Sequence, residues 1–297
     1  MLGSHYLYFV KHSFESRLLK SRKPLLAGFK ITNRCNLRCR ACPFWQMADD
    51  DVSYDAAINI LRKLHDAGVR LLIFEGGEPF IWKNNGQVFE DLVKEAKKLF
   101  FCTGVTTNGL LPLETATDTV WVSIDGLREN HDYNRGKSFD RVISNIEISS
   151  HPKILANITI NSMNCKEIPK LVEFLEGKVK GITIQFYYPY EGTEDLWVDR
   201  PERIWVLDQL VRLKKKGYSI LDSYVTLEAL KENRWHCHSW LIANAEPDGS
   251  INYGCYLKNR ADISCAKCGF AAHTEISKAY DWSRQAILAG STIFGLR

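Results

Sequence analysis

Seven of the nine cysteines in this 297-residue chain fall into two groups whose spacings are typical of metal ligands. The first group is Cys35, Cys39 and Cys42, with no histidine or fourth cysteine close by in sequence. Structural zinc takes four tetrahedral ligands, so this group would leave zinc one ligand short. A [4Fe–4S] cluster can use three cysteines and leave one iron open to a substrate or cofactor. The first group therefore predicts an iron–sulfur cluster.

The second group lies near the C-terminus and contains four cysteines. Its members are Cys237, Cys255, Cys265 and Cys268. Four thiolates can bind every iron of a second cluster. They also make a good tetrahedral set for zinc, because the group ends in a CxxC pair and has His236, His238 and His273 adjacent to it. The spacing alone leaves both alternatives open.

Composition excludes several classes of protein. Basic residues number 39 and acidic residues 35, an excess too small to indicate a nucleic-acid partner. No stretch approaches the length of a membrane span, and the N-terminus lacks the apolar core and cleavage site of a signal peptide. We therefore expect a cytoplasmic protein. Cys102 and Cys165 are isolated in the sequence, and such cysteines usually behave as small hydrophobic residues.

From residue 27 onward, β-rich runs alternate with amphipathic helical segments, which is typical of βα units and a parallel sheet. The six predicted strands cover 28–32, 70–75, 101–107, 119–125, 154–161 and 182–188. The predicted helices cover 54–67, 87–99, 139–149, 168–176 and 201–216. The repeat stops near residue 218. We predict an N-terminal helical segment in 1–25, a main domain in 26–218 and a smaller cysteine-rich α+β extension in 219–297.

The Cx3Cx2C loop after the first predicted strand resembles the signature of the radical S-adenosylmethionine (SAM) superfamily, and the resemblance spans about residues 26–200. It implies an α/β fold, a partial (β/α)6 TIM-type barrel, with a [4Fe–4S] cluster on Cys35, Cys39 and Cys42 at the barrel mouth. It also implies that the open iron binds SAM. One departure from the family pattern is Ala41, because an aromatic residue commonly precedes the third cysteine.

A glycine-rich motif ends the second predicted strand, and its residues are Gly76, Gly77, Glu78 and Pro79. The glycines allow close backbone approach, and Glu78 supplies a carboxylate. In isolation the motif is equally consistent with a simple strand-ending turn. The resemblance implies that it binds the amino group of the methionine part of SAM.

Polar residues at the ends of other predicted strands are further SAM-binding candidates under the resemblance, with ordinary turns and satisfied buried amides as the alternative. They are Thr107, Asn108, Ser123, Asn161 and Gln185. Arg135 is a candidate partner for the SAM carboxylate, since guanidinium pairs bidentately with carboxylate; a surface salt bridge is the alternative. Asp125 and Tyr188 are the candidate catalytic residues facing the substrate. Tyr188 belongs to an aromatic run that packing would also explain.

The C-terminal cysteines resemble the SPASM/twitch extension found in part of the superfamily. A Pro-Asp-Gly hairpin at 247–249 separates Cys237 from Cys255, and a CxxC pair follows. No cysteine follows Cys268, which matches the shorter twitch version with one auxiliary cluster. The resemblance implies that Cys237, Cys255, Cys265 and Cys268 bind a second [4Fe–4S] cluster.

The resemblance implies reductive cleavage of SAM to a 5′-deoxyadenosyl radical, with ferredoxin or flavodoxin as electron donor. The radical then abstracts hydrogen from a peptide, a cofactor precursor or a small alcohol or amine. An alternative is modification of an isoprenoid lipid by addition of the deoxyadenosyl radical or by C–C bond formation. The contrasting class is a non-catalytic zinc or iron–sulfur module.

Residues 5–20 predict a helix with one apolar stripe, formed by Leu7, Val10, Phe14 and Leu18. Basic residues lie close to this stripe in the sequence. We expect the stripe to dock on the barrel. The alternative is a basic amphipathic helix that rests on a membrane surface and makes the protein membrane-peripheral.

Overall fold

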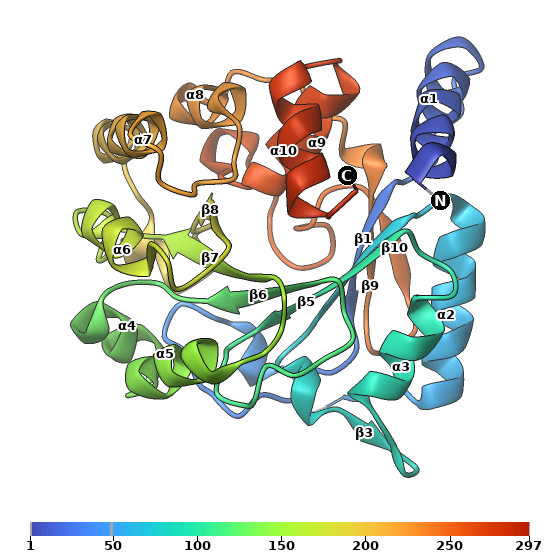
Figure 1. Cartoon of the computed structure of the whole chain (residues 1–297), viewed down its shortest axis with the longest axis horizontal. Coiled ribbons are helices and arrows are strands. Elements are labelled where there is room, and N and C mark those ends of the chain that lie inside the picture. The colour runs from blue at the N-terminus through green and yellow to red at the C-terminus, as the bar shows by residue number, and fades with distance from the viewer. Residues whose placement is uncertain (1, 48–49, 297) are drawn as a thin grey trace.

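The computed structural model describes residues 2–47 and 50–296 (Figure 1). Its main feature is an eight-stranded sheet in the order β10-β9-β1-β2-β5-β6-β7-β8. The strands are β1 Leu26–Lys30, β2 Leu71–Glu75, β5 Cys102–Thr107, β6 Thr119–Ser123, β7 Ile154–Ile160, β8 Gly181–Phe186, β9 Ile242–Ala245 and β10 Ile251–Tyr253. Every neighbouring pair is parallel except β9 with β10. The six predicted strands are confirmed within two residues at most ends, and the α/β fold with a mostly parallel, partial TIM-type barrel is confirmed.

Helices follow the strands and cover the outer face of the sheet (Figure 1). They are α2 Tyr54–Ala67, α3 Phe89–Ala96, α4 Arg128–Arg135, α5 Phe139–Ile148, α6 Ile168–Leu175 and α7 Arg200–Lys215. As predicted, the Ser53 side chain accepts a hydrogen bond from the Ala56 amide at the start of α2, and Gly68 ends that helix at φ +114°. The short helix α4 was not among the predicted helices.

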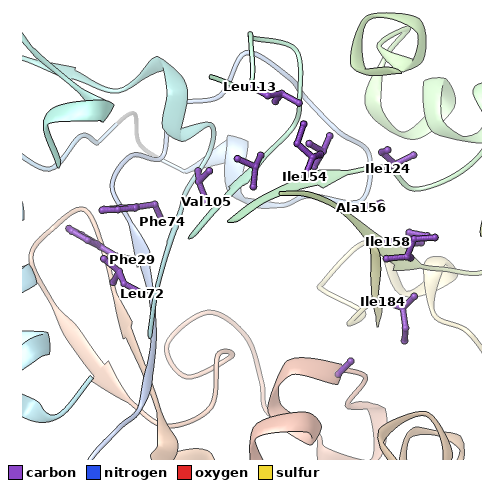
Figure 2. Close-up of a cluster of buried hydrophobic side chains, with 14 of the residues drawn as sticks. Phe29, Leu72, Phe74, Val105, Leu113, Ile124, Ile154, Ala156, Ile158 and Ile184 are labelled. Atoms are coloured by element: carbon purple, nitrogen blue, oxygen red, sulfur yellow. The ribbon is translucent and has the colours of Figure 1, made fainter. Parts of the chain in front are cut away.

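Alternation along each strand separates two environments. Phe29, Leu72, Phe74 and Val105 point toward the helices and belong to the main hydrophobic core (Figure 2). Residues at the intervening positions, such as Gly28 and Ile73, face the interior of the barrel. This follows from the two-residue period of a strand. The outward positions therefore stabilise the fold, and the inward positions are available for a site.

The C-terminal region joins the same sheet. β9 pairs in parallel with β1, and β10 adds an antiparallel edge strand. Three helices, α8 Tyr224–Glu232, α9 Ala271–Tyr280 and α10 Arg284–Ile293, lie across the open side of the curved sheet (Figure 1). Ile293 packs with Trp121 and Leu155 on the inner face of the sheet. The strands of the extension therefore continue the barrel sheet, while its helices cover the barrel's open side.

Minor elements complete the chain. A two-stranded hairpin is formed by β3 Lys83–Asn84 and β4 Gln87–Val88. Short 3-10 helices lie at Phe44–Gln46, Pro79–Ile81, Glu194–Leu196, Ser239–Leu241 and Cys265–Lys267.

The N-terminal helix α1, Leu2–Leu18, docks through a face other than the predicted one. The predicted stripe points outward, with Leu7 69%, Val10 57%, Phe14 59% and Leu18 64% exposed. The docking contacts come from the opposite side, where the Tyr8 hydroxyl donates to the Gly68 carbonyl at 2.6 Å and Phe9 packs beside Phe101. The expectation that the apolar stripe docks on the barrel is wrong, because Tyr8 and Phe9 on the other side of the helix make the docking contacts.

Candidate functional site

A cavity of about 640 Å³ occupies the barrel interior. This volume lies within the range of about 300 to 1,000 Å³ common for small-molecule sites. Inward-facing strand residues form much of the wall, and they include Gly28, Ile73, Glu75, Trp121, Ser123, Asn157, Thr159, Thr183 and Gln185. Cys35, Cys39 and Cys42 line the same cavity from the loop that follows β1. The cavity therefore brings the predicted cluster ligands and polar strand-end residues together.

The three cysteines have nitrogen donors beside them. The Arg135 Nη1 atom lies 3.9 Å from Cys39 Sγ, and the Asn108 Nδ2 atom lies 3.8 Å from Cys35 Sγ. Burial raises the pKa of the Cys39 thiol to about 11. A thiolate there needs a strong positive partner, such as the iron of a cluster.

Among the described residues, no three His, Cys, Asp or Glu side chains converge as ligands of a single metal ion. A [4Fe–4S] cluster does not require such convergence, because each cysteine binds a different iron. The donor set of three thiols at the wall of a cavity therefore fits a cluster with one open iron.

Gly76 and Gly77 lie just after β2, where the chain packs against the start of the cysteine loop. A Cβ on Gly77 would lie 2.0 Å from the Arg34 carbonyl oxygen, and one on Gly76 would lie 2.4 Å from the Thr32 carbonyl oxygen. The Gly77 amide donates to the Thr32 carbonyl at 2.8 Å. Only glycine allows this approach. The motif thus holds the base of the cysteine loop while its two glycines line the cavity.

Glu78 lies below the cavity wall and is fully buried. Its carboxylate accepts hydrogen bonds from the Thr107 hydroxyl and the Asn108 amide, both at 2.8 Å. Burial raises its pKa to about 7. Glu78 and Pro79 are not among the residues that line the cavity, whereas Thr107 and Asn108 are. The structure therefore gives Glu78 a positioning contact with the end of β5, and a direct contact with SAM stays a prediction.

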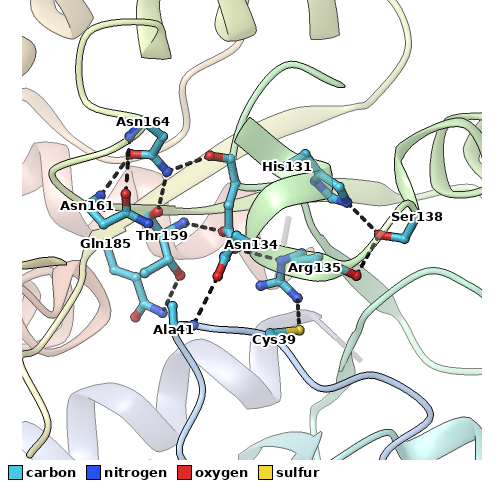
Figure 3. A network of polar contacts seen from close by, with 11 residues as sticks. Cys39, Ala41, His131, Asn134, Arg135, Ser138, Thr159, Asn161, Asn164 and Gln185 are labelled. Carbon is cyan, nitrogen blue, oxygen red and sulfur yellow. Dashed lines mark hydrogen bonds and ion pairs between the residues drawn. The ribbon is translucent and has the colours of Figure 1, made fainter. Parts of the chain in front are cut away.

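Arg135, which lies beside Cys39 in Figure 3, forms a buried ion pair with Asp125. Arg135 Nε donates to Asp125 Oδ2 at 2.6 Å, and the same oxygen accepts from Asn134 Nδ2 at 2.8 Å. Burial opposes the guanidinium charge, but the Asp125 carboxylate together with the Cys39 and Cys42 thiols outweighs it, so the pKa of Arg135 is raised. The Asn134 side chain also accepts from the Ala41 amide at 3.0 Å. The end of α4 therefore connects Asp125 to the cysteine loop, and the alternative of a surface salt bridge for Arg135 is wrong.

The remaining candidates divide by location. Ser123 and Gln185 line the cavity. Asn161 does not; its side chain accepts from the Met163 and Asn164 amides at the end of β7, as a satisfied buried amide does. Tyr188 lines the cavity, but its hydroxyl donates to the Asp262 carbonyl at 2.5 Å. This hydrogen bond links the segment after β8 to the loop that precedes the CxxC pair.

The C-terminal cysteines lie near one another. Burial raises the pKa of Cys237 to about 12, and the other three thiols of the group add to this effect. Cys255 and Cys268 likewise interact with Cys265. Cys255, Cys265 and Cys268 therefore lie close enough to Cys237 to interact with it electrostatically.

Two groups of charged residues in and beside the cavity were not identified from the sequence. Glu75 lines the cavity, and burial raises the pKa of its carboxyl group, with Tyr256 among the groups that oppose this rise. The Lys30 Nζ atom lies 3.7 Å from Glu246 near this pair. The available signal was a charged residue at the end of each of two otherwise apolar strands, β1 and β2.

The second unpredicted group lies on the opposite wall. Burial, with the carboxylate of Glu275, raises the pKa of Asp222 to about 7. Asp222 Oδ2 accepts from the Ile184 amide at 2.9 Å. Burial also lowers the pKa of His273 to about 4, so this cavity-lining imidazole is neutral at pH 7. No sequence signal marks this group, because the fold brings α8 and α9 together only in three dimensions.

This parallel barrel, with three cysteines after its first strand and a cavity at the strand ends, defines a class of cofactor-dependent α/β barrel enzyme. The family model described as "Radical SAM superfamily" matches residues 29–184, just over half of the chain. The chain belongs to the radical SAM superfamily.

Curated relatives carry several different names. The chain is 27% identical over 248 residues to Fe-coproporphyrin III synthase of Methanosarcina barkeri, covering 72% of this chain and 60% of that protein. It is 31% identical over 170 residues to the sporulation killing factor maturation protein SkfB of Bacillus subtilis, covering 52% and 40%. It is 27% identical over 273 residues to a probable GTP 3′,8-cyclase of Methanothermobacter marburgensis, covering 80% and 86%. The chain spans between 34% and 60% of the length of the first three curated relatives.

Solved structures share the fold. The SAM-bound structure of Streptococcus suis SuiB superposes with a TM-score of 0.67 at 16% identity, covering 96% of this chain and 70% of SuiB. Methylornithine synthase (PylB) superposes with a TM-score of 0.58 at 14% identity, covering 96% and 90%. At these identities the likeness establishes the fold alone.

Family membership makes the chain an enzyme of SAM-dependent radical chemistry and implies a [4Fe–4S] cluster, SAM and a reductant. The alternative of a non-catalytic metal module is therefore wrong. In the part of the chain that the structure describes, no helix is long and apolar enough to cross a membrane.

Proposed function

We propose that Cys35, Cys39 and Cys42 bind the catalytic [4Fe–4S] cluster and that SAM occupies the adjoining part of the cavity. The observation that carries this proposal is that the three cysteines line one cavity together with Gly76, Gly77 and other strand-end polar residues. When bound, the cluster supplies one electron to the sulfonium of SAM, which yields methionine and the 5′-deoxyadenosyl radical. The proposed reaction would then be the abstraction of a hydrogen atom from a substrate held in the same cavity.

The chain's own residues bind and orient the reacting groups. Thr107 and Asn108, positioned by Glu78, present a hydroxyl and an amide at the cavity wall. Arg135 holds a guanidinium beside Cys39, where it can also pair with the SAM carboxylate. Asp125 keeps that guanidinium in place. The barrel walls and α9 with α10 enclose much of the cavity, which limits the access of water to a radical.

We further propose that Cys237, Cys255, Cys265 and Cys268 bind a second [4Fe–4S] cluster and that ferredoxin or flavodoxin supplies the electrons. The close grouping of four thiols supports a four-thiolate site. Zinc is the competing occupant, because four thiolates also suit it.

The test is anaerobic reconstitution followed by metal analysis and a SAM-cleavage assay. We expect about eight irons per chain if both sites hold clusters and about four if only the first does. With dithionite and SAM, 5′-deoxyadenosine should form. Replacing Cys39 by Ala should abolish it, whereas Cys165→Ala, outside both groups, should retain it. Stoichiometric zinc at the second group would contradict the auxiliary cluster, and absence of 5′-deoxyadenosine from the loaded enzyme would contradict the proposed chemistry.

Replacement of the cysteines in the second group separates the two proposals. Cys268→Ala should lower the iron content by about half while the EPR signal of the first cluster persists. Unchanged iron content in this variant would show that the second group does not bind iron. The matched control is again Cys165→Ala, which should keep the full iron content.

A further inference from the structure

The outward stripe of α1 is an apolar surface that no part of the described chain covers. Leu7, Val10, Phe14 and Leu18 are between 57% and 69% exposed. A helix of a globular protein ordinarily turns such a stripe toward the core. Here the helix docks through its other face, so the apolar stripe remains exposed. Contiguous exposed apolar side chains generally mark an interaction site.

The same surface continues onto the turn between α9 and α10. The Arg17 guanidinium lies 4.4 Å from the centre of the Tyr280 ring and 5.8 Å from that of Trp282. Trp282 is 59% exposed and has φ +64°, a backbone conformation that is unfavourable for a bulky residue. The fold thus holds a large aromatic side chain out in solvent beside the α1 stripe. We call the surface formed by Leu7, Val10, Phe14, Leu18, Trp282 and Ile287 the α1/α10 face.

The cavity opens on this face. Four large apolar or aromatic residues both line the cavity and lie on the exposed surface: Tyr6, Val10, Trp282 and Ile287. They come from α1 on one side of the opening and from the start of α10 on the other. The walls farther in are apolar, as Ile73, Trp121, Ile276 and Phe294 line them. The same cavity ends at the three cysteines. An apolar path therefore joins the α1/α10 face to the proposed radical site.

Positive charge is concentrated in the segment that carries the apolar stripe. Residues 5–23 contain five basic side chains and one acidic side chain, an excess of four that equals the excess in the whole chain. The basic residues are Lys11, Arg17, Lys20, Arg22 and Lys23, and all are exposed. The rest of the chain is therefore electrically balanced. Charge separation of this kind favours an anionic partner at one surface.

We propose that the α1/α10 face docks on an anionic lipid bilayer and that its opening admits the apolar part of a lipid substrate to the radical site. The second half of this proposal rests on the proposed function. Exposed apolar side chains interleaved with Lys and Arg are the pattern by which interfacial helices bind membranes. A second copy of the chain fits less well, because it would place two surfaces of the same positive charge in contact.

The docking test uses the reconstituted full chain and sedimentation with vesicles. Vesicles of phosphatidylcholine mixed with phosphatidylglycerol should bind the protein at least about tenfold more tightly than vesicles of phosphatidylcholine alone, and high salt should weaken this binding. The double variant Leu7→Glu/Phe14→Glu should lose binding to both kinds of vesicle. Its matched control is Ile148→Glu, since Ile148 is 74% exposed at the end of α5, far from α1 in Figure 1. The control should bind as the unaltered protein does.

Three results would overturn docking on a bilayer: no preference for anionic vesicles, equal binding by Leu7→Glu/Phe14→Glu, or a dimer in light scattering that this variant abolishes. The last outcome would assign the face to a second copy. Formation of 5′-deoxyadenosine with dithionite is measured on the same preparations. If it persists while vesicle binding is absent, the docking proposal fails and the proposed function stands.

The opening is tested with a dansyl-labelled fatty acid as the probe. We expect stoichiometric binding to the unaltered chain and at least about tenfold weaker binding to Val10→Trp/Ile287→Trp, whose larger side chains narrow the opening. Equal binding by this double variant would refute the opening as the entry route. Binding of the variant to anionic vesicles should be retained, because its surface stays apolar.

Discussion

Removing the carboxylate of Asp125 tests whether the buried ion pair holds Arg135 beside the cysteine loop. Asp125→Asn keeps the size of the side chain and its acceptor for the Thr159 amide, which lies 3.1 Å from Oδ1. It removes the negative charge that lies 2.6 Å from Arg135 Nε. At an effective dielectric constant of about 20, that attraction is about 6 kcal/mol. Burial of both groups offsets part of it, since the side chains are 14% and 3% exposed. Breaking such a pair from one side costs about 3 to 5 kcal/mol.

The assay is urea unfolding of the reconstituted protein under argon, with iron content measured in parallel. We expect Asp125→Asn to lose about 3 to 5 kcal/mol of unfolding free energy and to retain less iron, because the uncompensated guanidinium moves away from Cys39. The double variant Asp125→Asn/Arg135→Gln leaves no buried charge unpaired, so it should be less destabilised than the sum of the two single variants.

An exposed ion pair supplies the control, and the additivity of the single variants supplies the result that would refute the interpretation. Asp140→Asn removes one partner of the exposed Arg128–Asp140 pair and should leave stability unchanged. Strict additivity of Asp125→Asn and Arg135→Gln would show that the two side chains do not stabilise each other. Full iron content in Asp125→Asn would show that the pair does not position the cysteine loop.

Three further predictions follow from the cavity walls. Burial and Glu275 raise the pKa of Asp222 from 3.8 to about 7, so the folded state binds this proton more tightly than the unfolded state does. The stability that this group contributes is fully present below about pH 4 and falls by about 1.4 kcal/mol per pH unit up to about pH 7. Between pH 5 and 7, the unfolding free energy from urea titrations should therefore fall less steeply for Asp222→Asn than for the unaltered protein. An equally steep fall in both would contradict the assignment. Gly77→Ala should lose iron and SAM cleavage, because the new Cβ would lie 2.0 Å from a backbone oxygen. The control is Gly290→Ala, whose Cβ would have no neighbour within 4 Å, and it should fold normally in a thermal melt. Tyr188→Phe leaves the Asp262 carbonyl and the Ser264 amide without their hydroxyl partner and should cost about 1 to 3 kcal/mol in urea unfolding; a value near zero would show that this tie is dispensable.

The first cysteine group and the strands were predictable because both depend on local sequence. The Cx3Cx2C spacing brings three thiols onto one loop whatever surrounds it, and runs of apolar residues between turn residues identify buried strands. The glycines of the second motif were also recognisable as positions of close approach, and the structure adds the carbonyl oxygens that require them. These features need no knowledge of distant contacts.

The detailed roles of polar side chains were not predictable in the same way. The hydrogen bond between the Glu78 carboxylate and Thr107 was not predictable, because only the pairing of β2 with β5 brings the end of β5 beside Glu78. Arg135 and Asp125 are ten positions apart, and the turn into α4 decides that they meet. Asp222 and Glu275 come from segments more than fifty residues apart, so no local pattern reveals them.

The sequence by itself determined the chemistry available to this protein: three thiols on a loop after a strand, a glycine pair after the next strand, and a barrel built from repeated βα units. The tertiary structure decided which surfaces are covered. Periodicity shows that Leu7, Val10, Phe14 and Leu18 share one face of a helix, but it does not show which face meets the barrel. That depends on the total contact surface of the docked helix, and here Tyr8 and Phe9 occupy the interface, leaving the apolar stripe beside the mouth of the cavity.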